Sequence, residues 1–221
     1  MYGATFASYA CMLAYRLPEG KSTWGRSRCE SCGRTLTWLE VLPIFGYFIA
    51  GGRCRACGYK IPLIYLLVEM LFGILSVWLL VNRPFWWYLR DIIILTLILA
   101  AGLSDLKQGK VPRKLSFALA VVGVFWWFLA GQWLVPVWGF WVSLPVVIMI
   151  ILESWQLGEG DVLFLIVLTI ALGLSLSIKV LAIAIILAGI FAFALRMRNC
   201  YLQSFPLATF LLAGAILSLF F

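Results

Sequence analysis

The sequence predicts an all-α polytopic membrane protein of about eight transmembrane helices, with one hydrophilic loop between the first and second helices. Two observations predict this fold class. First, 64% of the 221 residues are hydrophobic and only 12% are charged, against roughly one half and one quarter in ordinary soluble domains. Second, the apolar residues form a series of runs that approach the roughly 20 residues of a membrane-spanning helix. These two features exclude a water-soluble globular domain.

The apolar runs give eight candidate spans, at residues 2–15, 61–81, 88–104, 115–130, 134–152, 162–175, 180–195 and 205–221. The first span is short for a complete crossing, and neither a charged leader nor a small-residue cleavage site marks it as a secretory signal. We expect it to be retained as a helix. The predicted organisation is a first helix at 1–16, a loop at 17–60 and a seven-helix membrane domain at 61–221.

The basic residues are unevenly distributed between the predicted loops. Eight of the 17 Lys and Arg residues lie between Arg16 and Lys60, four between Lys107 and Lys114, and two at Arg196 and Arg198. In an eight-span topology these lie on one side, and the opposite side has only Arg83, Arg90 and Lys179. Because cytosolic loops carry an excess of Lys and Arg, we expect an outward N-terminus and a cytosolic first loop. The net charge of +8 then indicates contact with anionic membrane lipids and no nucleic-acid partner.

The complete absence of histidine limits the chemistry available to this chain. It excludes Ser-His and Cys-His nucleophiles, zinc proteases of the His-Glu-x-x-His type and histidine proton relays. Any proteolysis must use carboxylic acids or a Ser-Lys pair, and no lysine has an obvious serine partner. Carboxylates are therefore the residues to examine.

The first loop contains two C-x-x-C pairs, Cys29–Cys32 and Cys54–Cys57, separated by 21 residues and each followed by a glycine. Each pair can supply two thiolates to one ion, and four thiolates complete the tetrahedral shell of a structural zinc site, with no open position for catalysis. The alternative is two disulfides, which require an oxidising compartment. Because the basic residues put the loop in the reducing cytosol, the spacing favours zinc.

Two aspartates, Asp105 and Asp161, lie at the predicted cytosolic ends of the third and sixth spans. An ionisable residue at such a position is by default a candidate functional residue. Two carboxylates that meet cannot both ionise at low cost, so one holds a proton while the other acts as a base. This is the division of labour in an aspartyl protease. Each aspartate also has a structural alternative: Asp105 as an interfacial acid paired with Lys107, and Asp161 as a helix N-cap.

Two further features flank these acids and the cysteines. Gly158 and Gly160 precede Asp161 and permit an irregular backbone against which a substrate strand can lie. The apolar stretch from Trp38 to Phe48 separates the cysteine pairs, is too short to span a bilayer, and is expected to pack against the membrane face. Within it, Glu40 is expected to be a solvated acid or the partner of a loop arginine.

In order and spacing, the motifs resemble those of the type IV prepilin peptidases, bacterial membrane enzymes of the Gly-x-Gly-Asp aspartyl class. The resemblance rests on Tyr15-Arg16-Leu17-Pro18, the two C-x-x-C pairs, Gly52-Arg53-Cys54-Arg55, Leu67-Val68-Glu69, Asp105 with Val111-Pro112, Gly158-Glu159-Gly160-Asp161 and Phe205-Pro206. The sequence departs from the family pattern at Arg113 and Thr209, where the family often has a small polar residue and a proline. Neither departure removes a chemical group.

The resemblance implies cleavage of short, basic leader peptides from prepilins or pseudopilins of type IV pili or type II secretion. Cleavage would follow a glycine at the cytosolic face of the bacterial inner membrane, with Asp105 and Asp161 as the catalytic residues. Bifunctional family members also methylate the new N-terminal residue with S-adenosylmethionine. Gly52, Glu40 and Glu69 are tentative contributors to that activity. The alternative is that Gly52 is a turn residue and Glu69 an internal hydrogen-bond partner.

A different class of function remains open from the residues alone: a zinc-stabilised membrane scaffold or a transporter that binds cations or protons at the two aspartates. A transporter often shows inverted repeats with interrupted helices in matching halves. The Gly-x-Gly break has no clear counterpart elsewhere in the chain. The peptidase interpretation is therefore favoured, and the oligomeric state is not predicted.

Overall fold

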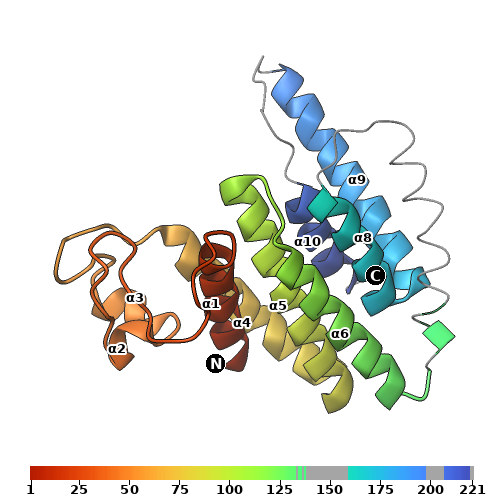
Figure 1. Ribbon diagram of the computed structural model, residues 1–221, viewed down its shortest axis with the longest axis horizontal. Coiled ribbons are helices and arrows are strands. Elements are labelled where there is room, and N and C mark those ends of the chain that lie inside the picture. The colour runs from red at the N-terminus through yellow and green to blue at the C-terminus, as the bar shows by residue number, and fades with distance from the viewer. Residues whose placement is uncertain (133, 136, 138–158, 198–206, 220–221) are drawn as a thin grey trace. The chain divides into compact units, whose positions relative to one another are not determined.

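The computed structural model describes residues 1–132, 134–135, 137, 159–197 and 207–219 (Figure 1). All regular elements in these residues are helices, apart from two isolated β-bridges in the first loop. The chain divides into two compact units, Met1–Ile92 and Ile93–Phe221. The all-α class is thus confirmed for the described part of the chain.

The first unit contains α1 (Tyr2–Arg16), α2 (Trp38–Val41), α3 (Phe45–Ile49), α4 (Leu63–Asn82) and the beginning of α5 (Phe85–Gln108). Helix α1 packs against α4 through small residues, and Ala4, Ala7, Ala10 and Ala14 are all buried on one of its faces. A Cβ atom on Gly3 would overlap the side chain of Ser76 on α4. Because small side chains let two backbones approach closely, this packing is typical of helices in membranes.

The second unit contains the rest of α5 and α6 (Arg113–Leu129), α8 (Glu159–Leu172), α9 (Leu174–Met197) and α10 (Leu207–Ser218). The same principle joins these helices in pairs. A Cβ on Gly123 of α6 would overlap Ala171 of α8, and a Cβ on Gly214 of α10 would overlap the Val180 carbonyl of α9. Close backbone contact therefore holds α6 to α8 and α9 to α10.

The helices agree with most of the predicted spans. Within the described residues, two helices are long and apolar enough to cross a membrane, Leu63–Asn82 and Leu174–Ala194, while Leu163–Leu172 and Leu207–Ser218 are shorter apolar helices. The predicted span at 134–152 lies almost entirely outside the described residues. The count of eight spans therefore stays a prediction, and so do the predicted domain bounds.

Candidate functional site

The two C-x-x-C pairs form matching tight turns. In the first, the backbone N–H of Gly33 donates to the Cys29 carbonyl at 3.0 Å, and in the second, Gly58 donates to Cys54 at 2.9 Å. Both glycines have left-handed backbone angles, with φ of 71° and 70°, a conformation that suits glycine because it lacks a Cβ atom. The glycine after each pair is therefore what folds the chain back on itself and brings two thiols together.

The turns bring all four cysteines into one cluster. The sulfur atoms of Cys29, Cys32, Cys54 and Cys57 lie within 4.8 Å of one another, with 3.8 Å between Cys29 and Cys57 and 4.0 Å between Cys32 and Cys54. A disulfide has sulfur atoms about 2.05 Å apart, whereas thiolates about 2.3 Å from a tetrahedral ion lie roughly 3.8 Å apart. The cluster thus has the spacing of metal ligands and not of disulfides.

The thiols of the cluster differ in how readily they lose a proton. Backbone N–H groups of Cys57 and Ala56 lower the pKa of the Cys54 thiol to about 6. A thiol must be deprotonated to ligate a metal. The second turn therefore favours the thiolate of Cys54. At Cys32 the Arg34 backbone N–H acts in the same direction, but burial and the neighbouring thiols outweigh it and raise the pKa to about 11, so a bound ion such as Zn²⁺ must displace that proton.

The buried side chain of Glu40 links several parts of the cysteine loop. Its carboxylate accepts hydrogen bonds from the Thr37 backbone N–H at 2.8 Å and from Arg34 at 2.6 Å, and Arg55 lies 3.9 Å away. These partners, the Thr37 N–H first, lower the pKa of Glu40 to about 2. Thr37 and Glu40 form a capping box at the start of α2. Of the two interpretations open from sequence, the arginine partner is the observed one.

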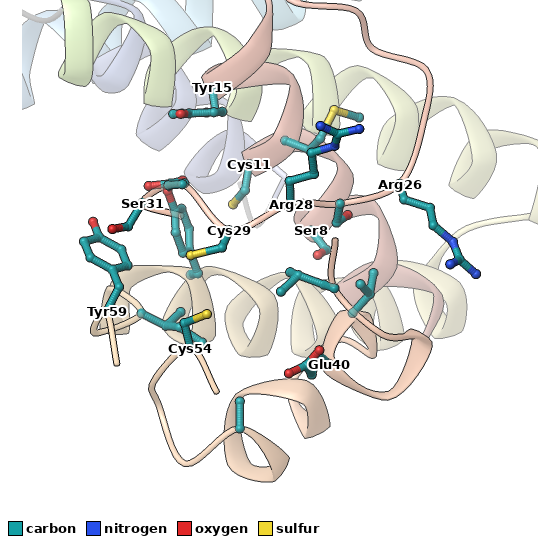
Figure 2. Close-up of a pocket in the computed structure, with 18 of the residues that line it drawn as sticks. Ser8, Cys11, Tyr15, Arg26, Arg28, Cys29, Ser31, Glu40, Cys54 and Tyr59 are labelled. Carbon is teal, nitrogen blue, oxygen red and sulfur yellow. The ribbon is translucent and has the colours of Figure 1, made fainter. Parts of the chain in front are cut away.

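A cavity of about 910 Å³ lies between α1, the cysteine loop and the beginning of α4 (Figure 2). Its lining includes acids, aromatic residues and cations, among them Tyr15, Arg16, Trp24, Arg28, Glu30, Glu40, Tyr47, Tyr59, Tyr65 and Glu69. Cys29, Cys32 and Cys54 of the cluster also line it. The metal cluster and the cavity are therefore neighbouring parts of one site.

Glu69, on α4, holds a strained turn at the edge of this cavity. Its carboxylate accepts the Ile44 backbone N–H at 2.7 Å. Ile44 has φ 66° and ψ −57°, and Phe45 N–H donates to the Pro43 carbonyl at 2.7 Å, which defines a γ-turn of the rare, strained kind. Glu69 is thus an internal hydrogen-bond partner, as one of the two sequence interpretations has it.

Gly52 occupies a turn with φ +66°, where a Cβ atom would meet the Tyr47 hydroxyl at 3.0 Å. Gly52 does not itself line the cavity, but Tyr47 does. Of the three residues that the resemblance associates with methylation, Glu40 and Glu69 line the cavity, and Gly52 lies beside Tyr47, which also lines it. Their proposed role in methylation stays a prediction.

Sequence reasoning missed the link between α4 and the first cysteine turn. The Tyr65 hydroxyl donates to the Glu30 carboxylate at 2.7 Å, and both residues line the cavity. One signal was available, because Tyr65 lies four residues before Glu69 and so shares its helix face. Nothing in the sequence indicates that Glu30 is the partner.

Asp105 lies near the end of α5 and is only 5% exposed. Its Oδ2 atom accepts the backbone N–H of Ala208 at 3.0 Å, in the first turn of α10. A carboxylate at a helix N-terminus interacts favourably with the unpaired N–H groups and the helix dipole. Asp105 is therefore buried, and α10 supplies one of its hydrogen-bond partners.

Asp161 is placed only in part. Glu159, Gly160 and Asp161 form the first turn of α8, while Gly158 and the side chain of Asp161 lie outside the described part. The irregular backbone expected at Gly160 is not observed, because this residue is already helical. Whether the two aspartates meet stays a prediction.

The comparisons with known proteins cover most of the chain. Residues 1–83 match the family model described as the bacterial peptidase A24 N-terminal domain, and residues 92–193 match the type IV leader peptidase family. No solved structure matches the chain significantly.

Among curated proteins, the chain is similar to three named "Prepilin leader peptidase/N-methyltransferase". It is 29% identical to the Myxococcus xanthus protein over 55% of this chain and 37% of that protein. It is 31% identical to the Vibrio cholerae protein over 38% of this chain and 34% of that protein. It is 32% identical to the Aeromonas hydrophila protein over 48% of this chain and 37% of that protein. The aligned segments thus span little more than a third of these relatives' lengths. With both family models matched in order, this chain belongs to the type IV leader peptidase family, the prepilin peptidases.

Proposed function

We propose that this protein is a membrane aspartyl endopeptidase that removes basic leader peptides from prepilins or pseudopilins. Cleavage follows a glycine at the cytosolic face of the bacterial inner membrane, with the N-terminus outside. The observation that carries the proposal is the match of residues 92–193 to the type IV leader peptidase family, because that segment contains both Asp105 and Asp161. The buried position of Asp105 supports it.

In the proposed reaction the two aspartates share one proton. The unprotonated carboxylate removes a proton from water as the water attacks the peptide carbonyl, and the protonated carboxylate donates to the carbonyl oxygen. Later steps return both protons and release the leader. The reaction needs no metal at the aspartates.

The proposal is tested by incubating the enzyme in lipid nanodiscs with a prepilin-like peptide and measuring product masses. Asp105→Asn and Asp161→Asn should each lower the cleavage rate by about 100-fold or more, since acid–base groups contribute about that much. Asp91→Asn is the control for loss of a buried acid on α5, because Asp91 pairs with Arg90 and has no proposed part in catalysis. Retained cleavage in either test variant, with normal metal content, would refute the assignment.

We also propose that the enzyme methylates the new N-terminal residue with S-adenosylmethionine bound in the 910 Å³ cavity. Small-molecule sites commonly enclose about 300–1,000 Å³. The lining combines aromatic rings and carboxylates with Lys and Arg side chains, which suits a ligand that carries both positive and negative groups. The cofactor supplies the methyl group. Glu69 holds the strained turn at the cavity edge, Glu40 holds the loop, and Gly52 leaves room for Tyr47.

Two neighbouring glycines give a sharp test of this second activity. Gly51 and Gly52 both have positive φ, so alanine strains both backbones equally, but only at Gly52 would a Cβ meet Tyr47. Gly52→Ala should weaken S-adenosylmethionine binding well beyond Gly51→Ala in calorimetric titration, while leader cleavage persists in both. Equal affinities of the two variants for S-adenosylmethionine would show that Gly52 and Tyr47 are not part of the binding site.

The four-cysteine cluster is the proposed site of a structural zinc ion. Its closed set of four thiolates leaves no ligand position for substrate, so zinc would order the loop without joining the chemistry. Elemental analysis of the purified protein identifies the metal. Membership in the peptidase family does not favour the alternative of a scaffold or a cation transporter.

A further inference from the structure

The short helices α2 and α3 lie at a defined depth along α4. Their connecting turn is tied to α4 by the 2.7 Å hydrogen bond between Ile44 N–H and the Glu69 carboxylate. Glu69 is six residues beyond Leu63, the first residue of α4, which corresponds to about 9 Å along the helix axis. Since α4 is apolar and long enough to cross a bilayer, a span that begins at Leu63 would put this turn about 9 Å inside it.

The segment 38–49 presents large apolar side chains to its surroundings. Trp38 is 72% exposed, Phe45 53% and Phe48 64%, and none of the three lines the cavity. Leu39, Val41 and Ile49 are exposed as well. Six large exposed apolar side chains within twelve residues point to a contact with a partner or a membrane.

The charges of the segment fit a membrane surface. Its single charged residue is Glu40, whose side chain is only 4% exposed and paired with Arg34. At the end of α3, the half-exposed Arg55 donates to the Ile49 carbonyl at 2.8 Å. The apolar face therefore carries no exposed acid and has a cation beside it, which suits anionic lipid headgroups.

We propose that residues 38–49 are an interfacial hairpin that inserts its aromatic face into the boundary between headgroups and acyl chains of an anionic phospholipid leaflet. Glu69 and the Ile44 turn hold the hairpin at that depth. Short amphipathic helices with aromatic and apolar faces bind membranes in this way, about 5–10 Å deep. The inference rests on the proposed membrane setting of α4.

Photo-crosslinking in nanodiscs that contain phosphatidylglycerol tests the inference with the full chain. A benzophenone amino acid replaces Phe48 in one variant, Leu71 of α4 in a second and Ala56 in a third; all three positions are exposed. Leu71 reports whether α4 contacts lipid, and Ala56 reports background at a surface position between two cysteines of the cluster. Metal content establishes that each variant is folded.

The expected result is a lipid adduct at Phe48 and Leu71 with a yield several-fold above that at Ala56. Adducts at Leu71 but not above background at Phe48 would overturn the hairpin while leaving α4 in the membrane. No adduct at Leu71 would instead refute the membrane setting of α4. A covalent dimer through Phe48 would overturn the inference by showing that a second copy covers the face.

Discussion

The cysteine loop and the paired helices are stabilised by different interactions. Between residues 17 and 60, only Gly46 and Cys54 are buried, so the loop depends on hydrogen bonds, ion pairs and the thiol cluster. In the helices, by contrast, close contacts such as Gly123 against Ala171 join one backbone to another. This difference leads us to expect that the loop depends on the proposed metal for its fold, whereas the helices depend on small residues at particular positions.

The largest expected effect is loss of the metal. In Cys54→Ser the cluster has three thiols, and we expect the metal to be lost and the loop to unfold, since structural zinc sites are worth about 10–16 kcal/mol in small domains. Elemental analysis and hydrogen exchange measure the two effects, and the helical circular dichroism should persist. Cys11→Ser, the same substitution in α1, should retain the metal. Retention in both variants would contradict the cluster.

The second prediction concerns the packing of two helices and leaves the cysteine loop unchanged. Gly123→Ala puts a Cβ atom into Ala171 of α8, and overpacking of this kind costs about 1–3 kcal/mol. We expect a lower thermal unfolding temperature with unchanged metal content. The control is Gly189→Ala on α9, because nothing lies within 4 Å of a Cβ there. Because alanine favours a helix over glycine at both positions, an equal effect of the two substitutions would show that the contact with Ala171 does not set the result.

A third prediction concerns pH in the loop. The pKa of Glu40 is lowered to about 2, so its contribution to stability is present above its ordinary pKa of about 4.3 and is lost as pH falls from about 5 to 2. The stability difference between wild type and Glu40→Gln should therefore shrink over that window in thermal unfolding.

Glu19→Gln is the matched control for this pH experiment. Glu19 pairs with Lys21 in an exposed salt bridge, and exposed pairs contribute little to stability. A pH-dependent difference of the same size in both variants would contradict the role of Glu40.

The smallest expected effect is at the junction between α4 and the loop. Tyr65→Phe removes the hydroxyl that donates to Glu30 at 2.7 Å, and loss of one such bond costs about 1 kcal/mol. We expect faster hydrogen exchange in the first cysteine turn with the metal retained. Tyr9→Phe on α1 should leave exchange in that turn unchanged. Unchanged exchange in Tyr65→Phe would show that this hydrogen bond to α4 does not stabilise the first cysteine turn.

The sequence predicted the helices well where apolar runs are uninterrupted. The span predicted at 61–81 is α4, at 63–82, and the one at 115–130 is α6, at 113–129. The prediction at 180–195 was too short, since α9 begins at Leu174. A single residue, Gly173 with φ of 80°, separates α8 from α9. Hydropathy alone does not reveal a backbone angle of this kind.

By itself, the sequence determined the helical class, the metal-binding spacing of the cysteines and the candidate aspartates, because composition, periodicity and ligand spacing are local properties of the chain. The tertiary structure alone decided that Ala208 donates to Asp105, that Glu69 accepts from Ile44 and that Tyr65 reaches Glu30. These contacts join residues far apart in the chain. A carboxylate accepts a hydrogen bond from whichever N–H or O–H donor the packing brings to it, and no local sequence pattern identifies that donor.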